Sequence, residues 1–163
     1  MNKAAPSELI PQNRQGGNYG TALQAASLWG HEAIVSLLLE KGANVNCNCG
    51  HYGFALEAAA FGGHLLISEK LLQYGADVDT EGGNFGTALQ TASSNGKWKI
   101  VKLLLDSGAS VNIQNGRFGS ALQAALRAGH IESSGLLRVH GALSLAISAN
   151  SLDWDRDFSF RAC

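Results

Sequence analysis

The sequence repeats itself at a fixed interval of 33 residues. The leucines of four related segments, Gly-Thr-Ala-Leu or a close variant, stand at positions 23, 56, 89 and 122. Two sets of glycines keep the same interval: Gly30, Gly63, Gly96 and Gly129, then Gly42, Gly75, Gly108 and Gly141. A fixed period without insertions predicts a chain built from copies of one supersecondary unit, each stacked on its neighbours.

Each copy is expected to contain two short helices. In the first copy an Ala-rich segment, residues 21–28, begins with a Thr that can accept backbone N–H bonds at the helix start. A second helix is predicted over residues 32–41, where Ile, Val and Leu recur at helical spacing. Gly42 follows, where a left-handed residue ends a helix without steric penalty. Residues 43–50 are then expected to form a projecting hairpin-like loop. Such short helices are unstable alone in water, so the copies must pack together.

Composition restricts the classes of function. The chain has 163 residues, enough for one domain, and 12 Lys and Arg against 13 Asp and Glu give a formal net charge of -1. Without a basic field, nucleic-acid binding is not expected. Residues 1–14 hold no long apolar run, which argues against a secretory signal or membrane span. We expect a monomer inside the cell, cytoplasmic or nuclear. Cys47 and Cys49 are too close in sequence for an easy mutual bridge, so reduced thiols are expected.

The segment GTALQAASLWGHEAIVSLLLEKGANVN, residues 20–46, resembles the ankyrin repeat family in its Thr at the helix start, paired alanines, Gly-His, Leu run and Gly-Ala-Asn-Val-Asn ending. The resemblance covers about residues 15–146. It implies an all-α solenoid of about four helix-turn-helix repeats with projecting hairpin loops. The family usually has Pro-Leu-His after the Thr, whereas this chain has Ala-Leu-Gln or Ala-Leu-Glu. That variant, with Tyr or Phe ahead of the Gly, is similar to ankyrin arrays of fungal multidomain proteins.

The period and its failures define the expected domain organisation. We predict an N-terminal arm or cap at residues 1–14 and a C-terminal cap or tail at residues 147–163. Between them we predict four repeats, at residues 15–47, 48–80, 81–113 and 114–146. In the fourth repeat Ser133, Ser134 and Gly135 interrupt the apolar pattern of the second helix. A mid-helix Gly costs about 1 kcal/mol relative to Ala, so this repeat is expected to behave as an end cap. The tail, with Trp154 and Phe158, either folds back over the last helix pair or is exposed.

The family resemblance implies partner binding on the concave side, at loop tips and exposed helix positions. Transferred position by position, it identifies these candidate partner-binding residues: Asn18, Leu28, Trp29, Lys41, His51, Phe61, Tyr74, Glu81, Asn84, Asn95, Arg117 and Arg127. Aromatic residues gather in the first two repeats and arginines lie toward the fourth, a composition typical of binding hot spots. We expect a non-catalytic module that binds a protein or peptide and needs no cofactor. The alternative is that Trp29 and Phe61 pack beneath the loops.

Three further patterns each allow a functional and a structural interpretation. The aromatic column, defined as Tyr19, Tyr52, Phe85 and Phe118, could form a ligand-binding ladder, although packing between hairpin and helix is favoured. Glu57, where the other repeats have Gln24, Gln90 and Gln123, could act with His51 in acid/base chemistry in a small-molecule or catalytic groove. The favoured interpretation is that Gln and Glu bind hairpin backbone groups. Cys47, Cys49 and His51 lack an evident fourth ligand, so metal binding is not expected.

Overall fold

The protein is described by a computed structural model over residues 19–117 and 119–142. Within these ranges the chain is helical, with two isolated β-bridges, Gly82 to Gly86 and Asn115 to Gly119, closing the loops ahead of α5 and α7. The helices are α1 Ala22–Trp29, α2 Glu32–Glu40, α3 Ala55–Gly62, α4 Leu65–Gln73, α5 Ala88–Ser94, α6 Trp98–Asp106, α7 Ala121–Arg127 and α8 Ile131–Val139. The predicted all-α solenoid of helix pairs is confirmed.

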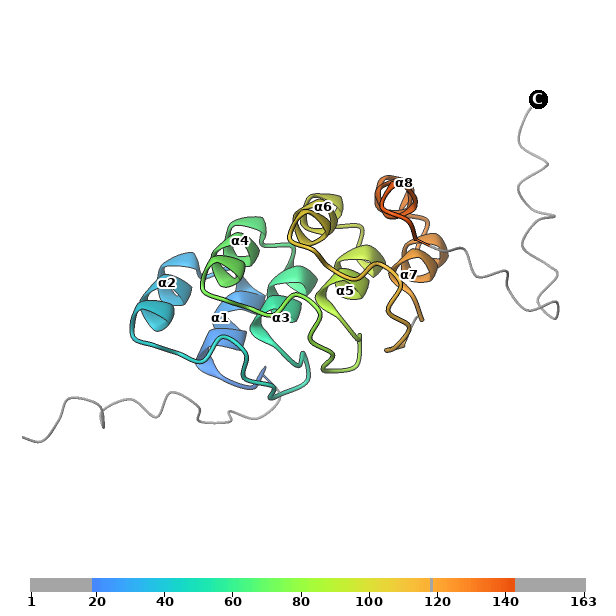
Figure 1. Cartoon of the computed structure of the whole chain (residues 1–163). Helices are drawn as coiled ribbons and strands as arrows, with labels where there is room; N and C mark the ends of the chain where they lie inside the picture. The colour runs from blue at the N-terminus through green and yellow to red at the C-terminus, as the bar shows by residue number, and fades with distance from the viewer. Residues whose placement is uncertain (1–18, 118, 143–163) are drawn as a thin grey trace, which may run out of the picture.

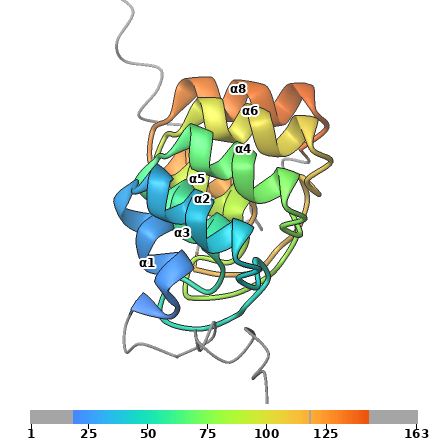
Figure 2. The ribbon, with the colours of Figure 1, turned by 90° about the vertical axis from the view of Figure 1, so that its left-hand side faces the viewer.

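The helices form two layers. The helices α1, α3, α5 and α7 pack side by side as an inner row, while α2, α4, α6 and α8 form an outer row (Figure 1). Within each repeat the two helices also pack against each other. Figure 2 shows the stack from the end where α1 and α2 lie, with the outer helices α2, α4, α6 and α8 in order one behind another. The loops that join one repeat to the next project from the inner row, so each first helix and its preceding loop share one face, called here the inner face.

Residues at the repeat interval build the core. Leu23, Leu56, Leu89 and Leu122 of the inner row are each at most 2% exposed. Leu71, Leu104 and Leu137 of the outer row are fully buried. Buried alanines between the inner helices allow close approach of their backbones. The 33-residue period therefore places equivalent side chains in one continuous core, which is how a solenoid buries what a single repeat would leave in water.

Hydroxyl side chains start three of the inner helices. The side chains of Thr21, Thr87 and Ser120 accept a hydrogen bond from the backbone N–H of the residue three further on. That residue is Gln in each case, and its side chain in turn accepts from the N–H of the cap residue, which completes a capping box. Helix α3 differs, because Phe54 occupies its N-cap and supplies no side-chain hydrogen bond. The predicted Thr or Ser caps are thus confirmed outside the second repeat.

The fourth repeat keeps its second helix despite its interrupted pattern. Helix α8 runs through Gly135, and both serines on its core side are buried. The hydroxyl of Ser134 donates to the carbonyl of Ile131 at 2.9 Å, whereas the buried hydroxyl of Ser133 has no hydrogen-bond partner in the part of the chain described. A buried polar group without a partner is unfavourable, so the departure from the pattern weakens packing without abolishing the helix.

A second set of repeat-spaced residues ties the outer turns together. Asn46 accepts a hydrogen bond from the backbone N–H of Asp77 and donates to the carbonyl of Gly75, both at 3.0 Å. One interval on, Asp79 accepts from the N–H of Ser110 at 2.8 Å, and a further interval on, Asn112 donates to the carbonyl of Gly141 in the fourth repeat. These side chains satisfy backbone groups of the neighbouring repeat, so they fix the spacing between repeats as well as the turn.

Candidate protein-binding surface

Four aromatic side chains from two consecutive loops and one inner helix meet on the inner face. Phe61, near the end of α3, lies with its ring centroid 5.1 Å from that of Tyr52 and 5.4 Å from that of Phe85. His51 stands edge-on to both neighbours, 5.3 Å from Tyr52 and 6.3 Å from Phe85. Tilted and edge-on contacts in this range are favourable for aromatic rings. We call His51, Tyr52, Phe61 and Phe85 the aromatic cluster.

A separate aromatic pair lies in the first repeat. The rings of Tyr19 and Trp29 are 6.3 Å apart and tilted by 55°. Both remain accessible, Tyr19 at 49% and Trp29 at 61% of their surface. In the column itself, Tyr19 contacts Trp29 of α1, while Tyr52 and Phe85 both contact Phe61 of α3, which lies between them. This arrangement agrees with packing between hairpin and helix and not with a directly stacked ladder. Phe118 lies outside the described residues.

Contacts between loop tips hold the cluster in place. The Nδ2 atom of Asn84 lies 3.2 Å from Nδ1 of His51, and the two residues occupy the same position in successive repeats. Both side chains are exposed, while Tyr52 and Phe85 next to them are half-buried. The inner face therefore offers polar tips around a partly covered aromatic centre, as in the polar rim and apolar core of protein interfaces.

The remaining inner-face candidates divide into packed and exposed side chains. Leu28 is only 7% exposed, and its carbonyl oxygen lies 3.0 Å from Nε2 of His64. Asn95 is half-buried and donates to the carbonyl of Thr91 at 3.1 Å. Three other candidates, Glu81, Arg117 and Arg127, are exposed. Asn18 lies outside the described residues. Leu28 and Asn95 thus serve local packing and helix ends, whereas the charged candidates are accessible to a partner.

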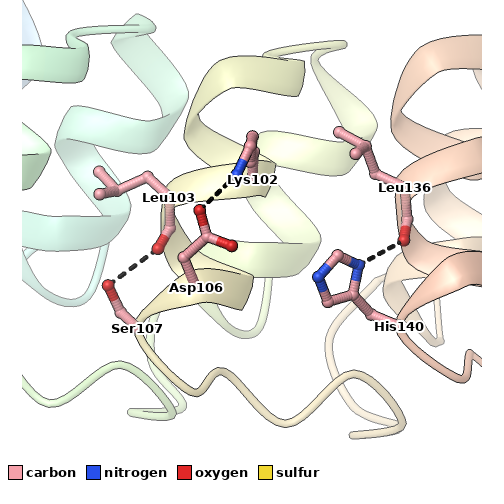
Figure 3. A network of polar contacts seen from close by, with 6 residues as sticks. All are labelled: Lys102, Leu103, Asp106, Ser107, Leu136 and His140. Atoms are coloured by element: carbon pink, nitrogen blue, oxygen red, sulfur yellow. Dashed lines mark hydrogen bonds and ion pairs between the residues drawn. The ribbon is translucent and has the colours of Figure 1, made fainter.

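The candidates Lys41 and Tyr74 lie at the ends of second helices, in the outer row, and Ser107 and His140 take the same position in the third and fourth repeats. Lys41, Tyr74, Ser107 and His140 are the C-cap residues of α2, α4, α6 and α8. Figure 3 shows how two of them bond to their own helices: the Ser107 hydroxyl donates to the Leu103 carbonyl at 2.8 Å, and Nδ1 of His140 lies 2.8 Å from the Leu136 carbonyl oxygen. Both carbonyls also accept the backbone N–H of the same cap residue, so these side chains add a second hydrogen bond within their own helix ends. Tyr74 remains 48% exposed on this row.

The Gln side chains of the inner helices clamp the loop of the following repeat. The Nε2 atom of Gln24 donates to the carbonyls of Cys47 at 3.1 Å, Cys49 at 2.7 Å and Gly53. Gln90 makes the corresponding bonds one junction further along, to Ile113, Asn115 and Gly119. Both amides are buried. The prediction that this column binds hairpin backbone groups is confirmed for these two repeats.

Glu57 takes the clamp position in the second repeat. Its side chain is 2% exposed and accepts a hydrogen bond from the backbone N–H of Gly82 at 3.1 Å. Burial raises the pKa of Glu57 from its ordinary 4.5 to about 9, against the lowering effect of backbone N–H bonds at Phe54 and Gly82. His51 instead lies exposed among Asn84 and the aromatic rings. The two groups named for the alternative acid/base site therefore sit in different environments, one clamping a loop and one on its surface.

Two histidines that follow a glycine at the repeat interval join neighbouring repeats. Besides His64 at Leu28, Nε2 of His130 lies 3.1 Å from the carbonyl oxygen of Ser94. Each ring thus reaches the end of the preceding first helix, where a carbonyl lacks an intrahelical partner. Gly62 lies under the His64 ring, because a Cβ there would meet ring atoms at 2.6 Å.

The sequence pattern identified the residues of the aromatic cluster, but it did not predict that their side chains contact one another. Tyr52 and Phe85 were visible as members of the aromatic column, and Phe61 as an exposed helix position. The signal that could have joined them is the one-repeat offset by which Phe61 reaches the following loop. Within the described ranges, no three His, Cys, Asp or Glu side chains come together as a metal site would require, and no helix has the length and hydropathy of a membrane span.

Comparison with known proteins agrees with this architecture. The family model for ankyrin repeats, in three copies, matches residues 3–82 and again residues 56–142. The two matches overlap and together extend over most of the chain. No curated protein matches it.

Proposed function

The chain belongs to the ankyrin repeat family, and from this premise we propose that it binds a protein or peptide through the aromatic side chains of its inner face. Ankyrin repeats are generally protein–protein interaction modules. In a repeat protein the scaffold is common to many functions and specificity comes from surface positions, so the argument rests on particular side chains.

The observation that carries the proposal is the exposure of Trp29. A Trp that is 61% accessible at the end of an inner helix leaves a large apolar surface in water, and Tyr19 beside it does the same. The aromatic cluster lies beside this pair along the stack, with its helical member Phe61 on α3, which packs directly against α1. Tryptophan and tyrosine are the residues most enriched at interface hot spots, because they bury much area with little loss of conformational freedom.

The charged candidates support an acidic partner element. Arg127 ends α7 and is exposed, and Arg117 is exposed on the loop ahead of it. A guanidinium can bind a carboxylate through two parallel hydrogen bonds, which gives orientation as well as affinity. We infer a partner that places an apolar or aromatic anchor on the first repeats and a carboxylate-bearing segment toward the fourth. The partner contacts the outer row only at its edge, through Lys41, Tyr74 and the equivalent cap residues.

The wording of the repeat motif supports an inference about the origin of the protein. Ala-Leu-Gln segments with Tyr or Phe ahead of the Gly favour an array of the type common in fungal multidomain proteins, with an intracellular partner. Neither inference alters the binding proposal.

A matched pair of tryptophan variants tests the proposal. Trp29→Ala removes the inner-face anchor, and Trp98→Ala removes a Trp of comparable exposure, 43%, from the outer row. The full chain is immobilised, and proteins captured from a lysate are quantified by mass spectrometry. Loss of a hot-spot Trp costs about 2 kcal/mol or more, so capture of the true partner should fall at least about tenfold for Trp29→Ala.

The control is expected to retain capture at the wild-type level. Helical circular dichroism and the thermal midpoint of all three proteins show whether folding is preserved, as the exposure of both side chains predicts. Equal capture by Trp29→Ala and wild type, with both folded, would contradict the inner-face assignment. If the proposal holds, Arg127→Ala should also weaken capture of the partner. It should reduce the salt dependence of that capture, since an exposed charge pair is screened by ions.

A further inference from the structure

Two cysteines of one loop lie side by side in the junction between the first and second repeats. The sulfur atoms of Cys47 and Cys49 are 2.8 Å apart, and no disulfide joins them. Cys49 is buried, with 8% of its surface accessible, whereas Cys47 is half-buried. The pair therefore has one sulfur that a reagent can reach and one that is shielded beside it.

We propose that Cys47 and Cys49 form a redox modification site, which reacts with a small-molecule disulfide such as oxidised glutathione and closes into an intramolecular disulfide. The distance carries the proposal. A disulfide S–S bond is about 2.05 Å long, so the two sulfurs must approach by less than about 1 Å to bond. The side-chain amide of Gln24 donates to the backbone carbonyls of both cysteines and so holds the loop in this arrangement. The fold thereby raises the effective concentration that each thiol presents to the other.

The reaction balances as two successive thiol–disulfide exchanges. The Cys47 thiolate attacks one sulfur of glutathione disulfide and releases one glutathione thiolate, which leaves a mixed disulfide on Cys47. Cys49 then loses its proton to solvent and attacks the Cys47 sulfur, and the second glutathione leaves as thiolate. One S–S bond is broken and one is formed. The protein dithiol gives up two electrons, and two molecules of reduced glutathione are produced.

The environments of the two sulfurs assign the order of attack. Burial and the neighbouring Cys47 raise the pKa of the Cys49 thiol to about 11, so Cys49 stays protonated at neutral pH. Its S–H lies 3.4 Å from the side-chain oxygen of Gln24, a contact that is lost when the thiol is oxidised. Cys47 is the more accessible sulfur and reacts first, while Cys49 resolves the mixed disulfide from inside the loop.

Closure of this disulfide would act on the loop that carries part of the aromatic cluster. The carbonyls of both cysteines are acceptors of the Gln24 amide, and His51 and Tyr52 follow Cys49 after a single glycine. A bond between residues 47 and 49 therefore shortens the segment just ahead of the cluster. This consequence rests on the proposed function, whereas the redox chemistry does not, and the experiment measures the chemistry alone.

The test uses the full chain with Cys163→Ser, so that only the loop thiols react. Protein is equilibrated in mixtures of reduced and oxidised glutathione, quenched with acid, alkylated and digested with trypsin. The peptide of residues 42–70 contains both cysteines and no internal Lys or Arg. We expect this peptide to lose two hydrogens and to resist alkylation. Native protein should oxidise with an equilibrium constant at least about tenfold above that of the chain in denaturant, a difference of about 30 mV for two electrons.

Single-cysteine variants provide the matched controls. Cys49→Ser should accumulate glutathione on Cys47, because the resolving thiol is gone. Cys47→Ser should react more slowly, because Cys49 is buried. In the two-cysteine protein, a persistent glutathione adduct, no reaction at either thiol, or equal equilibrium constants in native buffer and denaturant would each overturn the proposal. The native-to-denatured comparison is made on the same polypeptide, so a folding defect in a variant cannot imitate a negative result.

Discussion

Glu57 accepts a hydrogen bond from the backbone N–H of Gly82 at 3.1 Å, across the junction between the second and third repeats. At the junctions before and after it, Gln24 and Gln90 instead donate side-chain amides to the loops that follow them. A carboxylate can only accept, whereas the amide of Gln both accepts and donates. A protonated carboxyl regains one donor. The second junction is therefore held by a carboxyl group in a place where the other repeats use a neutral amide, and its stability depends on proton binding.

Replacing Glu57 with Gln should stabilise the protein at neutral pH and flatten its pH dependence. The pKa of Glu57 is raised from 4.5 to about 9 by burial, so between these values the folded state holds a proton that the unfolded state has lost. Stability from this group is present below pH 4.5 and is lost as the pH rises toward 9. The limiting slope is about 1.4 kcal/mol per pH unit.

Urea unfolding of wild type and Glu57→Gln near pH 5 and again near pH 8 checks this expectation. The gap between the two free energies of unfolding should widen with pH. Curves that stay parallel over this window would show that Glu57 is ionised in the folded protein.

The clamp itself should be worth more than an ordinary helix cap. Gln90→Ala removes the donor to three half-buried loop carbonyls, which costs about 2–4 kcal/mol in total. Gln123→Ala is the matched control, because Gln123 shows hydrogen bonds only to Ser120 among the described residues. Its loss should cost about 1 kcal/mol, the usual value of a cap. Chemical denaturation of both variants measures the difference, and equal losses would locate the effect in the capping box alone.

Two helical glycines should respond in opposite directions to the same substitution. At Gly62, the last residue of α3, a Cβ would lie 2.5 Å from the Leu28 carbonyl oxygen and against the His64 ring, so Gly62→Ala should destabilise the junction between the first two repeats. At Gly135 in α8, a Cβ would meet nothing within 4 Å. There the gain in helix propensity, about 1 kcal/mol, should appear in full. Thermal midpoints of the two variants give the signs directly, and a stabilising Gly62→Ala would mean that His64 moves aside freely.

The ion pair on the surface of α6 should contribute little. Lys102 and Asp106 lie 2.6 Å apart at four-residue spacing, but both side chains are more than half exposed (Figure 3). Solvent screening limits such pairs to about 0.5 kcal/mol or less. Asp106→Asn should therefore change the free energy of unfolding by no more than this, measured by urea denaturation at low and high salt. A larger loss that disappears in high salt would show a pair stronger than its exposure predicts.

The sequence predicted the candidate surface in part, and the reasons differ from residue to residue. Trp29 was found because the family resemblance, transferred position by position, places the end of the first helix on the binding side. Leu28 was included with it, yet the structure buries Leu28 beneath the neighbouring repeat. Adjacent helix positions differ by about 100° in direction, so one residue more or less decides between core and surface. The packing of the next repeat decides which of the two residues is buried, and the local sequence pattern carries no information about that packing.

The sequence by itself determined the repeat, the helix pairs and their caps. These features depend on side chains within a few residues of each other: apolar spacing along a helix, a hydroxyl at its start, and a glycine such as Gly42, with φ of 80°, at its end. The sequence also predicted that the Gln column binds hairpin backbone groups, but tertiary structure alone decided which carbonyls each Gln reaches and which aromatic side chains meet. Gln24 reaches the Cys49 carbonyl, and Phe61 reaches Phe85. It also set the 2.8 Å approach of two sulfurs whose close spacing in the sequence argued against a disulfide. Such meetings depend on how far each repeat is shifted and rotated against the next, and only the packing of the whole stack fixes that geometry.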